Sequence, residues 1–160
     1  MAGERVQRRL AAILAADVAG YSRLVGSDDE GTFAALKACR ELVALKSKQH
    51  RGRIVNTPGD SALVEFASAV DAARCAVEIQ KEMARRNAVI PEDRRLEFRI
   101  GIDVGDIIID EGDIYGDGVN IAARVESLAN PGGICLSENA YQQIKGKLTL
   151  NASDMGASNS

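Results

Sequence analysis

The chain has 160 residues, enough for one domain with its own hydrophobic core. Hydrophobic residues make up 46% of the sequence and aromatic residues only 4%, with no tryptophan, which argues against stacking platforms for nucleic acid bases. The net charge of −3 gives no sign of a basic surface for a phosphate backbone, so we expect no nucleic acid partner.

The N-terminal segment superficially resembles a targeting signal, because arginines precede the apolar run from Leu10 to Ala16. Asp17 ends this run, and a buried strand explains it better. No stretch approaches the ~20 apolar residues that a membrane span needs. The cysteines are far apart and odd in number, which is typical of buried thiols in a reducing compartment: Cys39, Cys75 and Cys135. We therefore expect a cytoplasmic protein, with no membrane segment in this chain.

The predicted elements follow the order β-α-β-β-α-β, and further elements come after them. Hydrophobic periodicity and turn residues give strand 9–18, helix 27–50, strand 53–57, strand 62–66, helix 68–87 and strand 96–104. This order is the ferredoxin-like split βαβ pattern of the α+β class. Right-handed crossovers then give the strand order 4-1-3-2, with antiparallel neighbours. An extended segment 107–109, helix 117–128, strand 134–136 and a short helix to about residue 145 follow.

Three of the predicted helices have a predicted cap, and three have predicted inward residues. The S-x-x-E and S-x-x-D patterns at Ser27 and Ser68 predict helix caps, and Ser137 is a third candidate cap. Helical spacing predicts these inward residues: Phe33, Leu36, Leu42, Val43 and Leu45 in the first helix; Val70, Ala73, Val77 and Met83 in the second; Val119, Ala122, Ala123 and Val125 in the third.

Two aspartates are predicted to meet at one end of the sheet. Asp17 ends the first strand, and Asp60 lies in the Pro58-Gly59-Asp60 turn between the second and third strands. Two neighbouring carboxylates are costly unless a cation lies between them. Carboxylate oxygens suit Mg²⁺ or Mn²⁺. Alone, each residue would be an ordinary turn aspartate, so the topology is what indicates a metal site.

Three ordered motifs resemble those of class III adenylate and guanylate cyclases of bacterial type. Asp17 to Ser22 is similar to D-[IV]-x-G-[FY]-[ST], and Thr57 to Ser61 followed by Glu65-Phe66 is similar to the second metal motif. Asp113 to Arg124 is similar to D-x-x-G-x-x-V-N-x-A-x-R, and the strand before it carries Gly101-Ile102-Asp103-Val104-Gly105. Three motifs in order are far more specific than any one of them.

The resemblance implies the nucleotide cyclase fold and a catalytic domain over residues 9–150, with an N-terminal extension 1–8 and a polar tail 151–160. It implies an ATP substrate, cyclic AMP and pyrophosphate as products, and a homodimer whose subunits share each site. On one subunit, Asp17 and Asp60 would bind two Mg²⁺ or Mn²⁺ ions, and the backbone near Gly20 would hold the phosphates.

The partner subunit would supply the remaining nucleotide contacts in this resemblance. Asp113 would accept a hydrogen bond from the adenine amino group, Asn120 would orient the ribose, and Arg124 would stabilise charge on the α-phosphate. Asn120 and Arg124 are four residues apart and therefore share one helix face.

Two departures from the family pattern keep other functions open. Asn56 stands where adenylate cyclases of the family usually have Lys; its amide can still contact a purine, but it discriminates adenine from guanine less sharply. The family's terminal strands and their phosphate-binding Lys are not found before the polar tail, so we expect a truncated C-terminal part. The alternatives are a non-catalytic or weakly active nucleotide-binding regulatory domain, and a guanylate cyclase.

Overall fold

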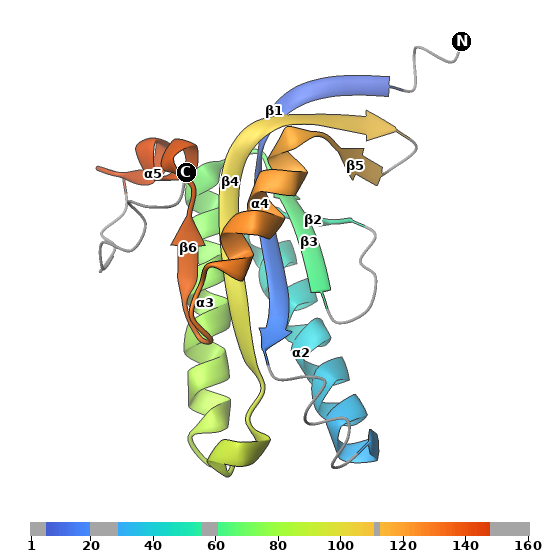
Figure 1. The fold of residues 1–160 in the computed structure, drawn as a ribbon, viewed down its shortest axis with the longest axis vertical. Helices are drawn as coiled ribbons and strands as arrows, with labels where there is room; N and C mark the ends of the chain where they lie inside the picture. The colour runs from blue at the N-terminus through green and yellow to red at the C-terminus, as the bar shows by residue number, and fades with distance from the viewer. Residues whose placement is uncertain (1–5, 20–28, 56–60, 111–112, 148–160) are drawn as a thin grey trace.

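The computed structural model describes residues 6–19, 29–55, 61–110 and 113–147. Figure 1 shows one twisted sheet with helices on both faces. Helices α2 (Asp29–Gln49) and α3 (Ala69–Asn87) cover one face, and α4 (Asp117–Ser127) covers part of the other. None of the helices in the described ranges is long and apolar enough to cross a membrane.

The sheet has the predicted strand order. Its strands are β1 (Val6–Ala19), β2 (Arg53–Ile54), β3 (Ser61–Phe66), β4 (Glu97–Asp110), β5 (Asp113–Tyr115) and β6 (Ile134–Leu136). They are arranged β2-β3-β1-β4-β5, and β6 pairs in parallel with β4. The first four strands therefore have the order 4-1-3-2 with antiparallel neighbours, which confirms the prediction. The extended segment 107–109 proves to be part of β4, which runs unbroken along β1.

The predicted caps at Ser68 and Ser137 are confirmed. The Ser68 hydroxyl accepts a hydrogen bond from the Asp71 backbone N–H at 3.3 Å, at the start of α3. The Ser137 hydroxyl accepts one from the Ala140 N–H at 3.1 Å, at the start of α5 (Glu138–Ile144). Each bond satisfies a backbone donor that the first helical turn leaves without a partner. The proposed cap Ser27 lies outside the described residues.

The central strand β1 separates two hydrophobic cores, because its side chains alternate between the faces of the sheet. Ala12, Leu14, Ala16 and Val18 belong to the larger core under α2 and α3, whereas Ala11, Ile13 and Ala15 belong to a smaller core on the α4 side. Because both sides of the sheet are covered along the middle of β1, the strand is apolar at every position from Ala11 to Ala16, within the run that the sequence predicts to be buried.

Some predicted inward residues lie outward. Phe33 is 69% exposed and Leu45 is 53% exposed, because the buried stripe of α2 runs through Leu36, Cys39 and Val43 and includes two polar residues, Thr32 and Ser47. In α3 the buried face is made by Ala72, Ala73, Cys75, Ala76, Ile79 and Met83, while Val70 and Val77 are only half-buried. Ala123 is exposed because α4 turns Gly118, Ala122 and Val125 inward.

The three cysteines are buried thiols, as predicted. Burial raises the pKa of Cys39 and of Cys75 to about 11 each, so both thiols stay protonated near neutral pH. The Cys39 sulfur lies 4.0 Å from the Met83 sulfur, in the contact between α2 and α3. These thiols therefore contribute to packing, and their reactivity as nucleophiles is low.

Candidate functional site

Asp17 lies near the end of β1, between two other strands. Its backbone pairs with Ser61 of β3 on one side and with Arg99 of β4 on the other. The half-buried side chain accepts a hydrogen bond through Oδ1 from the Val18 backbone N–H at 2.9 Å. Asp60 directly precedes Ser61 in the sequence but lies outside the described residues, as do Gly20 and Asn56.

Arg99 is a site neighbour that sequence reasoning missed. Directly opposed residues of antiparallel strands have Cβ atoms about 4.5–5.5 Å apart and share one face of the sheet. The half-buried Arg99 side chain therefore belongs beside the Asp17 carboxylate, and its buried Nε has no hydrogen-bond partner among the described residues. The alternation of strand 96–104 places Arg99 on this face, but only the strand register identifies Asp17 as its neighbour.

The α4 helix presents the predicted nucleotide residues to solvent. Asn120 and Arg124 are both exposed, one helical turn apart, so they lie on the outer side of the helix. Arg124 is in the last turn, where the helix dipole favours a positive charge. Asp113 begins β5, where its backbone pairs with Asp110 of β4. The structure thus places all three on β5 and α4, one short segment of chain.

Two glycines of β4 let α4 lie directly on the strand. A Cβ at Gly101 would come within 2.3 Å of the Glu126 backbone nitrogen and 2.8 Å of the Ala122 carbonyl oxygen. A Cβ at Gly105 would come within 3.3 Å of the Gly118 Cα. The helix therefore touches the strand through backbone atoms near both of its ends, and the segment that carries Asn120 and Arg124 spans the interval between these contacts.

Glu65, which the second motif includes, has a structural role in this fold. It is 5% exposed, and its two carboxylate oxygens are bonded to different arginines. Arg9 of β1 donates to Oε2, and Arg53 of β2 donates to Oε1 from Nε and Nη2 at 3.1 and 2.8 Å. This ion-pair cluster joins three neighbouring strands, and it compensates the buried charge.

The donor atoms at the end of β1 fit a hard divalent cation. Asp17 offers carboxylate oxygen, the ligand type that Mg²⁺ and Mn²⁺ prefer. Within the described ranges, no group of three or more His, Cys, Asp and Glu side chains is close enough to hold a metal ion. The predicted pair has only two members, and the second, Asp60, lies outside those ranges.

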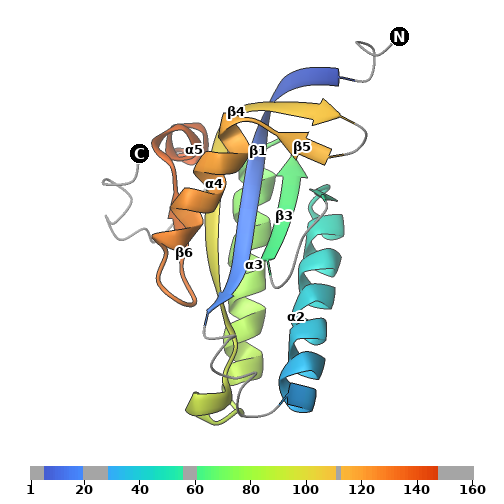
Figure 2. The ribbon, with the colours of Figure 1, turned by 45° about the vertical axis from the view of Figure 1, so that its right-hand side comes forward.

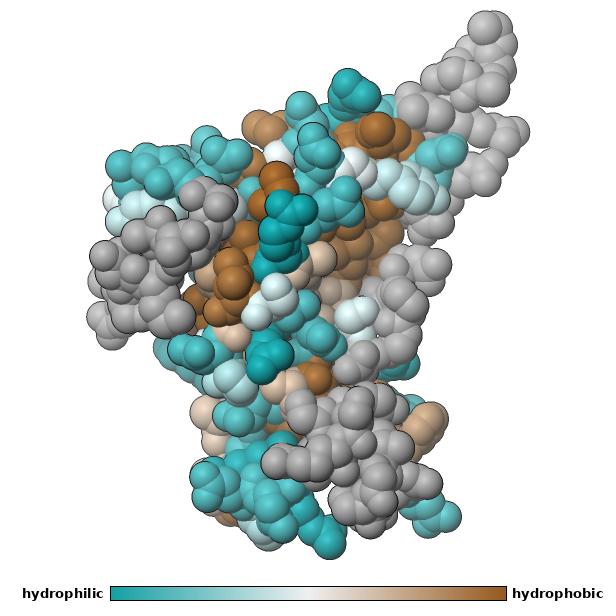
Figure 3. Space-filling view, in the orientation of Figure 1, coloured by the Kyte–Doolittle hydropathy of each residue, from teal (hydrophilic) through white to brown (hydrophobic). Residues whose placement is uncertain are grey.

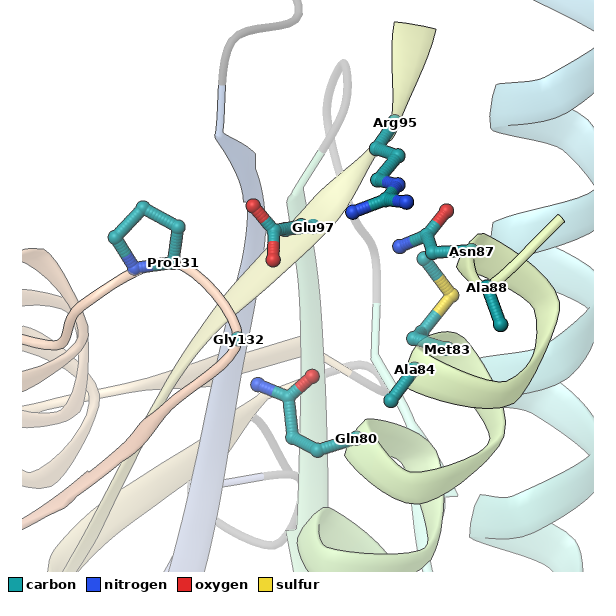
Figure 4. Close-up of a pocket in the computed structure, with 9 residues that line it drawn as sticks. All are labelled: Gln80, Met83, Ala84, Asn87, Ala88, Arg95, Glu97, Pro131 and Gly132. Carbon is teal, nitrogen blue, oxygen red and sulfur yellow. The ribbon is translucent and has the colours of Figure 1, made fainter. Parts of the chain in front are cut away.

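A separate cavity of about 370 Å³ opens between α3, the start of β4 and the turn before β6 (Figure 4). Three of the polar side chains in its wall already bond to backbone oxygens of the protein. Gln80 donates to the Phe98 and Gly133 carbonyl oxygens, Asn87 donates to the Leu96 carbonyl oxygen, and Arg95 donates through Nε to the Ile90 carbonyl oxygen. None of the described residues that line the cavity is a predicted site residue.

The face of the sheet that bears α4 is only partly covered. Leu63, Ile109 and Val119 pack against the smaller core and remain partly open to solvent. Figure 2 shows α4 lying across one part of this face, and Figure 3 shows hydrophobic surface beside it. Open apolar surface of this kind marks contact sites for other molecules.

The fold and the ordered motifs together define a nucleotide cyclase catalytic domain. The profile described as the adenylate and guanylate cyclase catalytic domain matches residues 6–158, and the chain belongs to this family. This finding confirms the resemblance that the motifs indicated.

Two individual relatives are named as adenylate cyclases. The chain is 45% identical over 157 residues to "Putative adenylate cyclase 3" of Rhizobium meliloti (strain 1021), covering 98% of this chain and 27% of the relative. It is 32% identical over 141 residues to "Adenylate cyclase" of Streptomyces coelicolor, covering 88% of this chain and 35% of the relative. The chain therefore spans about a third or less of the length of these two proteins.

A solved structure confirms the nucleotide cyclase fold. The adenylate/guanylate cyclase/hydrolase from Silicibacter pomeroyi superimposes with a TM-score of 0.89 at 43% sequence identity, covering 94% of this chain and 88% of that one. The helices and the mixed sheet described above are therefore the arrangement found in cyclase catalytic domains.

Proposed function

We propose that the chain is the catalytic domain of an adenylate cyclase and converts ATP to cyclic AMP and pyrophosphate as a homodimer. Family membership supports the reaction class, and the names of the two sequence relatives support ATP as the substrate. The observation that carries the proposal is the pairing of Asp17 with Ser61, because Ser61 directly follows Asp60 in the chain.

In this proposal, Asp17 and Asp60 hold two Mg²⁺ or Mn²⁺ ions at the end of β1. When bound, the ions lower the pKa of the ribose 3′-hydroxyl and neutralise the triphosphate. The bond from the Val18 N–H orients one oxygen of Asp17, and Arg99 brings a positive charge to the same face for the phosphates. Gly20, which follows Ala19 in the sequence, would permit the backbone to approach them closely. A metal-bound Asp17 is a poor general base, so we assign none.

The partner subunit supplies the nucleotide contacts. Its Asn120 orients the ribose, so that the 3′-oxygen attacks the α-phosphorus in line, and its Arg124 stabilises the charge that develops on the α-phosphate. Both side chains are exposed in the single chain and therefore free to reach across an interface. The partly open apolar residues Leu63, Ile109 and Val119 are the surface on which the second subunit would pack.

The base contacts favour ATP over GTP. The Asp113 carboxylate accepts a hydrogen bond from an amino group at purine position six, which adenine has and guanine lacks. Asn56 can donate or accept at the purine edge, so it adds less discrimination than the Lys that it replaces. Guanylate cyclase activity is therefore the alternative within the same fold, and the solved relative carries both names.

A second candidate function is a regulatory domain that binds a nucleotide without turning it over. The sequence observation that favours it is Asn56 in the base-binding position. Such a domain would bind ATP and would show activity only together with a complete partner subunit.

The test is to mix two inactive variants, Asp17→Ala and Asn120→Ala. With ATP and Mn²⁺, wild type forms cyclic AMP and pyrophosphate, and each variant alone is inactive. Because half of randomly assembled dimers are mixed and each then has one intact site, the mixture recovers about a quarter of wild-type activity.

Parallel assays separate the alternatives. GTP as the better substrate would support a guanylate cyclase. ATP binding without product at high enzyme concentration would support the regulatory domain. Mixed dimers that form without regaining activity would reject the shared-site arrangement.

A further inference from the structure

Asp103 is a buried carboxyl that the proposed reaction does not use. It lies in the middle of β4, opposite Ile13 of β1, and is only 1% exposed. The side chain points to the α4 side of the sheet, because Ile102 and Val104 on either side of it belong to the core under α2 and α3. It is therefore a polar group inside the smaller of the two cores.

Asp103 lies between the two points at which α4 contacts β4 through backbone atoms. It lies between Gly101 and Gly105, the two strand residues on which the helix backbone rests, and it is the only side chain of β4 on that face between these contacts. Its Oδ2 is 3.0 Å from the point where a Cβ of Gly105 would lie, beside the contact with Gly118. Asp103 thus adjoins the first turn of α4.

The carboxyl also adjoins α5. The Ser137 N–H bonds to the Ile102 carbonyl oxygen at 2.9 Å, which brings this cap residue next to Asp103. Burial raises the pKa of the Asp103 carboxyl, and the Ser137 side chain and the Val104 backbone oppose that rise only in part. Neither carboxylate oxygen has a well-formed hydrogen bond from a described residue. Glu65, which is also paired with Ile13 on the same row, contrasts with it because two arginines bind Glu65.

We propose that Asp103 is a positioning residue, which sets the place of α4 on the sheet and thereby the places of Asn120 and Arg124. This inference rests on the proposed function, in which those two side chains contact the substrate. A group that occupies the space between β4, Gly118 and Ser137 determines where the first turn of the helix can lie. Since α4 moves as one rigid element, a shift at its first turn displaces both functional residues together.

The first experiment separates turnover from binding. Misplacing catalytic groups by about 1 Å can cost about 100-fold in rate. We therefore expect Asp103→Ala to lower kcat for ATP about 10- to 100-fold, with KM changed by less than about threefold. Asp103→Asn keeps the size and polarity of the side chain, so it should retain most of the activity. Asp106→Asn, at an exposed position of the same strand, is the matched control and should behave as wild type.

The second experiment locates the damage within the dimer. In shared sites, an Asp103→Ala subunit still contributes intact metal ligands, so mixing it with Asp17→Ala restores activity. Mixing it with Asn120→Ala gives no recovery, because both subunits are then defective in the α4 half. A variant that merely unfolds would rescue neither. If circular dichroism shows that Asp103→Ala is not folded, Asp103→Ser replaces it in the experiment. This variant also removes the carboxyl, with a smaller expected loss of stability, and the same mixing results are expected for it.

The outcomes distinguish this inference from the proposed function. If wild type is inactive, or Asp17→Ala and Asn120→Ala do not complement each other, the proposed function fails first. If they do complement, three results overturn the positioning role. The first is an unchanged kcat in folded Asp103→Ala. The second is recovery of activity when Asp103→Ala is mixed with Asn120→Ala. The third is no recovery of activity when Asp103→Ala is mixed with Asp17→Ala.

Discussion

Two buried acidic residues on the same row of the sheet differ in the charged side chains around them. Glu65 and Asp103 both pair with Ile13, one from β3 and one from β4. Arg9 and Arg53 compensate the charge of Glu65. Burial raises the pKa of the Asp103 carboxyl above its ordinary value of 3.8, and no basic residue in the described part of the chain bonds to its carboxylate oxygens. Protonation of Asp103 is therefore linked to folding.

The linkage predicts a pH-dependent difference between wild type and Asp103→Asn. The folded state holds its proton to higher pH than the unfolded chain does, so wild type loses stability as pH rises from about 3.8 through the raised pKa. The neutral Asn variant has no such loss. The free energy of unfolding of Asp103→Asn minus that of wild type, measured in urea, should increase with pH over this range and then level off.

Asp106→Asn is the control for this measurement, because Asp106 is exposed on the same strand. A difference between Asp103→Asn and wild type that does not change with pH would contradict the linkage.

At the scale of elements, the contact between α4 and β4 includes two places where the helix lies close to a glycine of the strand. Gly101 faces the Glu126 nitrogen and the Ala122 carbonyl oxygen, whereas Gly105 faces the Asp103 carboxylate and the Gly118 Cα at longer distances. Backbone atoms of a packed helix cannot give way without moving the helix, whereas a side-chain oxygen can shift by a few tenths of an ångström.

Alanine substitutions at the two glycines should therefore differ in severity. Gly101→Ala should destabilise the fold by about 3 kcal/mol or more, and Gly105→Ala by about 1 kcal/mol, since overpacking typically costs 1–3 kcal/mol. Urea denaturation of both variants measures the difference. Equal losses, or a greater loss at Gly105, would show that α4 is not held to the strand in this way.

The whole molecule is one half of the proposed catalyst. The end of β1 carries Asp17, the α4 segment carries Asn120 and Arg124 on its exposed side, and the face between them is only partly covered. Two copies related by a twofold axis would bring each end of β1 to the partner's α4 and would cover apolar surface at the same time. Activity should then depend on the assembly of two chains.

Dilution tests this dependence directly. Cyclic AMP formed per chain should fall as the chain is diluted below the dissociation constant of the dimer, and it should reach a plateau at high concentration. Addition of the inactive Asp17→Ala chain to dilute wild type should raise the activity, because each mixed dimer has one intact site. An inert protein at the same concentration is the control. Activity per chain that is constant across dilution, with monomers seen by sedimentation, would contradict the proposal.

The sequence predicted the parts of the fold that depend on local signals. Strand order followed from the βαββαβ sequence of elements, and the caps at Ser68 and Ser137 followed from short motifs. The buried stripe of α2 was harder to predict, because Thr32 and Ser47 contribute to it while Phe33 is exposed. Hydropathy cannot select a polar residue for an inward position when only tertiary packing determines the rotation of the helix.

The candidate site shows the same limit. The position of Asp17 at the end of the first strand followed from topology, whereas its neighbour Arg99 required the strand register. The alternation of apolar and polar residues in β4 predicted that Asp103 faces away from the apolar side chains of that strand. Its burial results from α4, a helix that comes later in the sequence. The roles of Asp60, Asn56 and Gly20 stay predictions, since these residues lie outside the described ranges.

The division of the interior by the sheet has a consequence for how such a protein can change over time. The larger core, under α2 and α3, includes no residue of α4, the helix that carries Asn120 and Arg124. Under the proposed function, we expect substitutions there to alter mainly the stability of the folded molecule, and substitutions in the smaller core to alter turnover as well. If the chain is the proposed cyclase, its stability and its catalytic rate can therefore be changed separately, by mutation on opposite sides of one sheet.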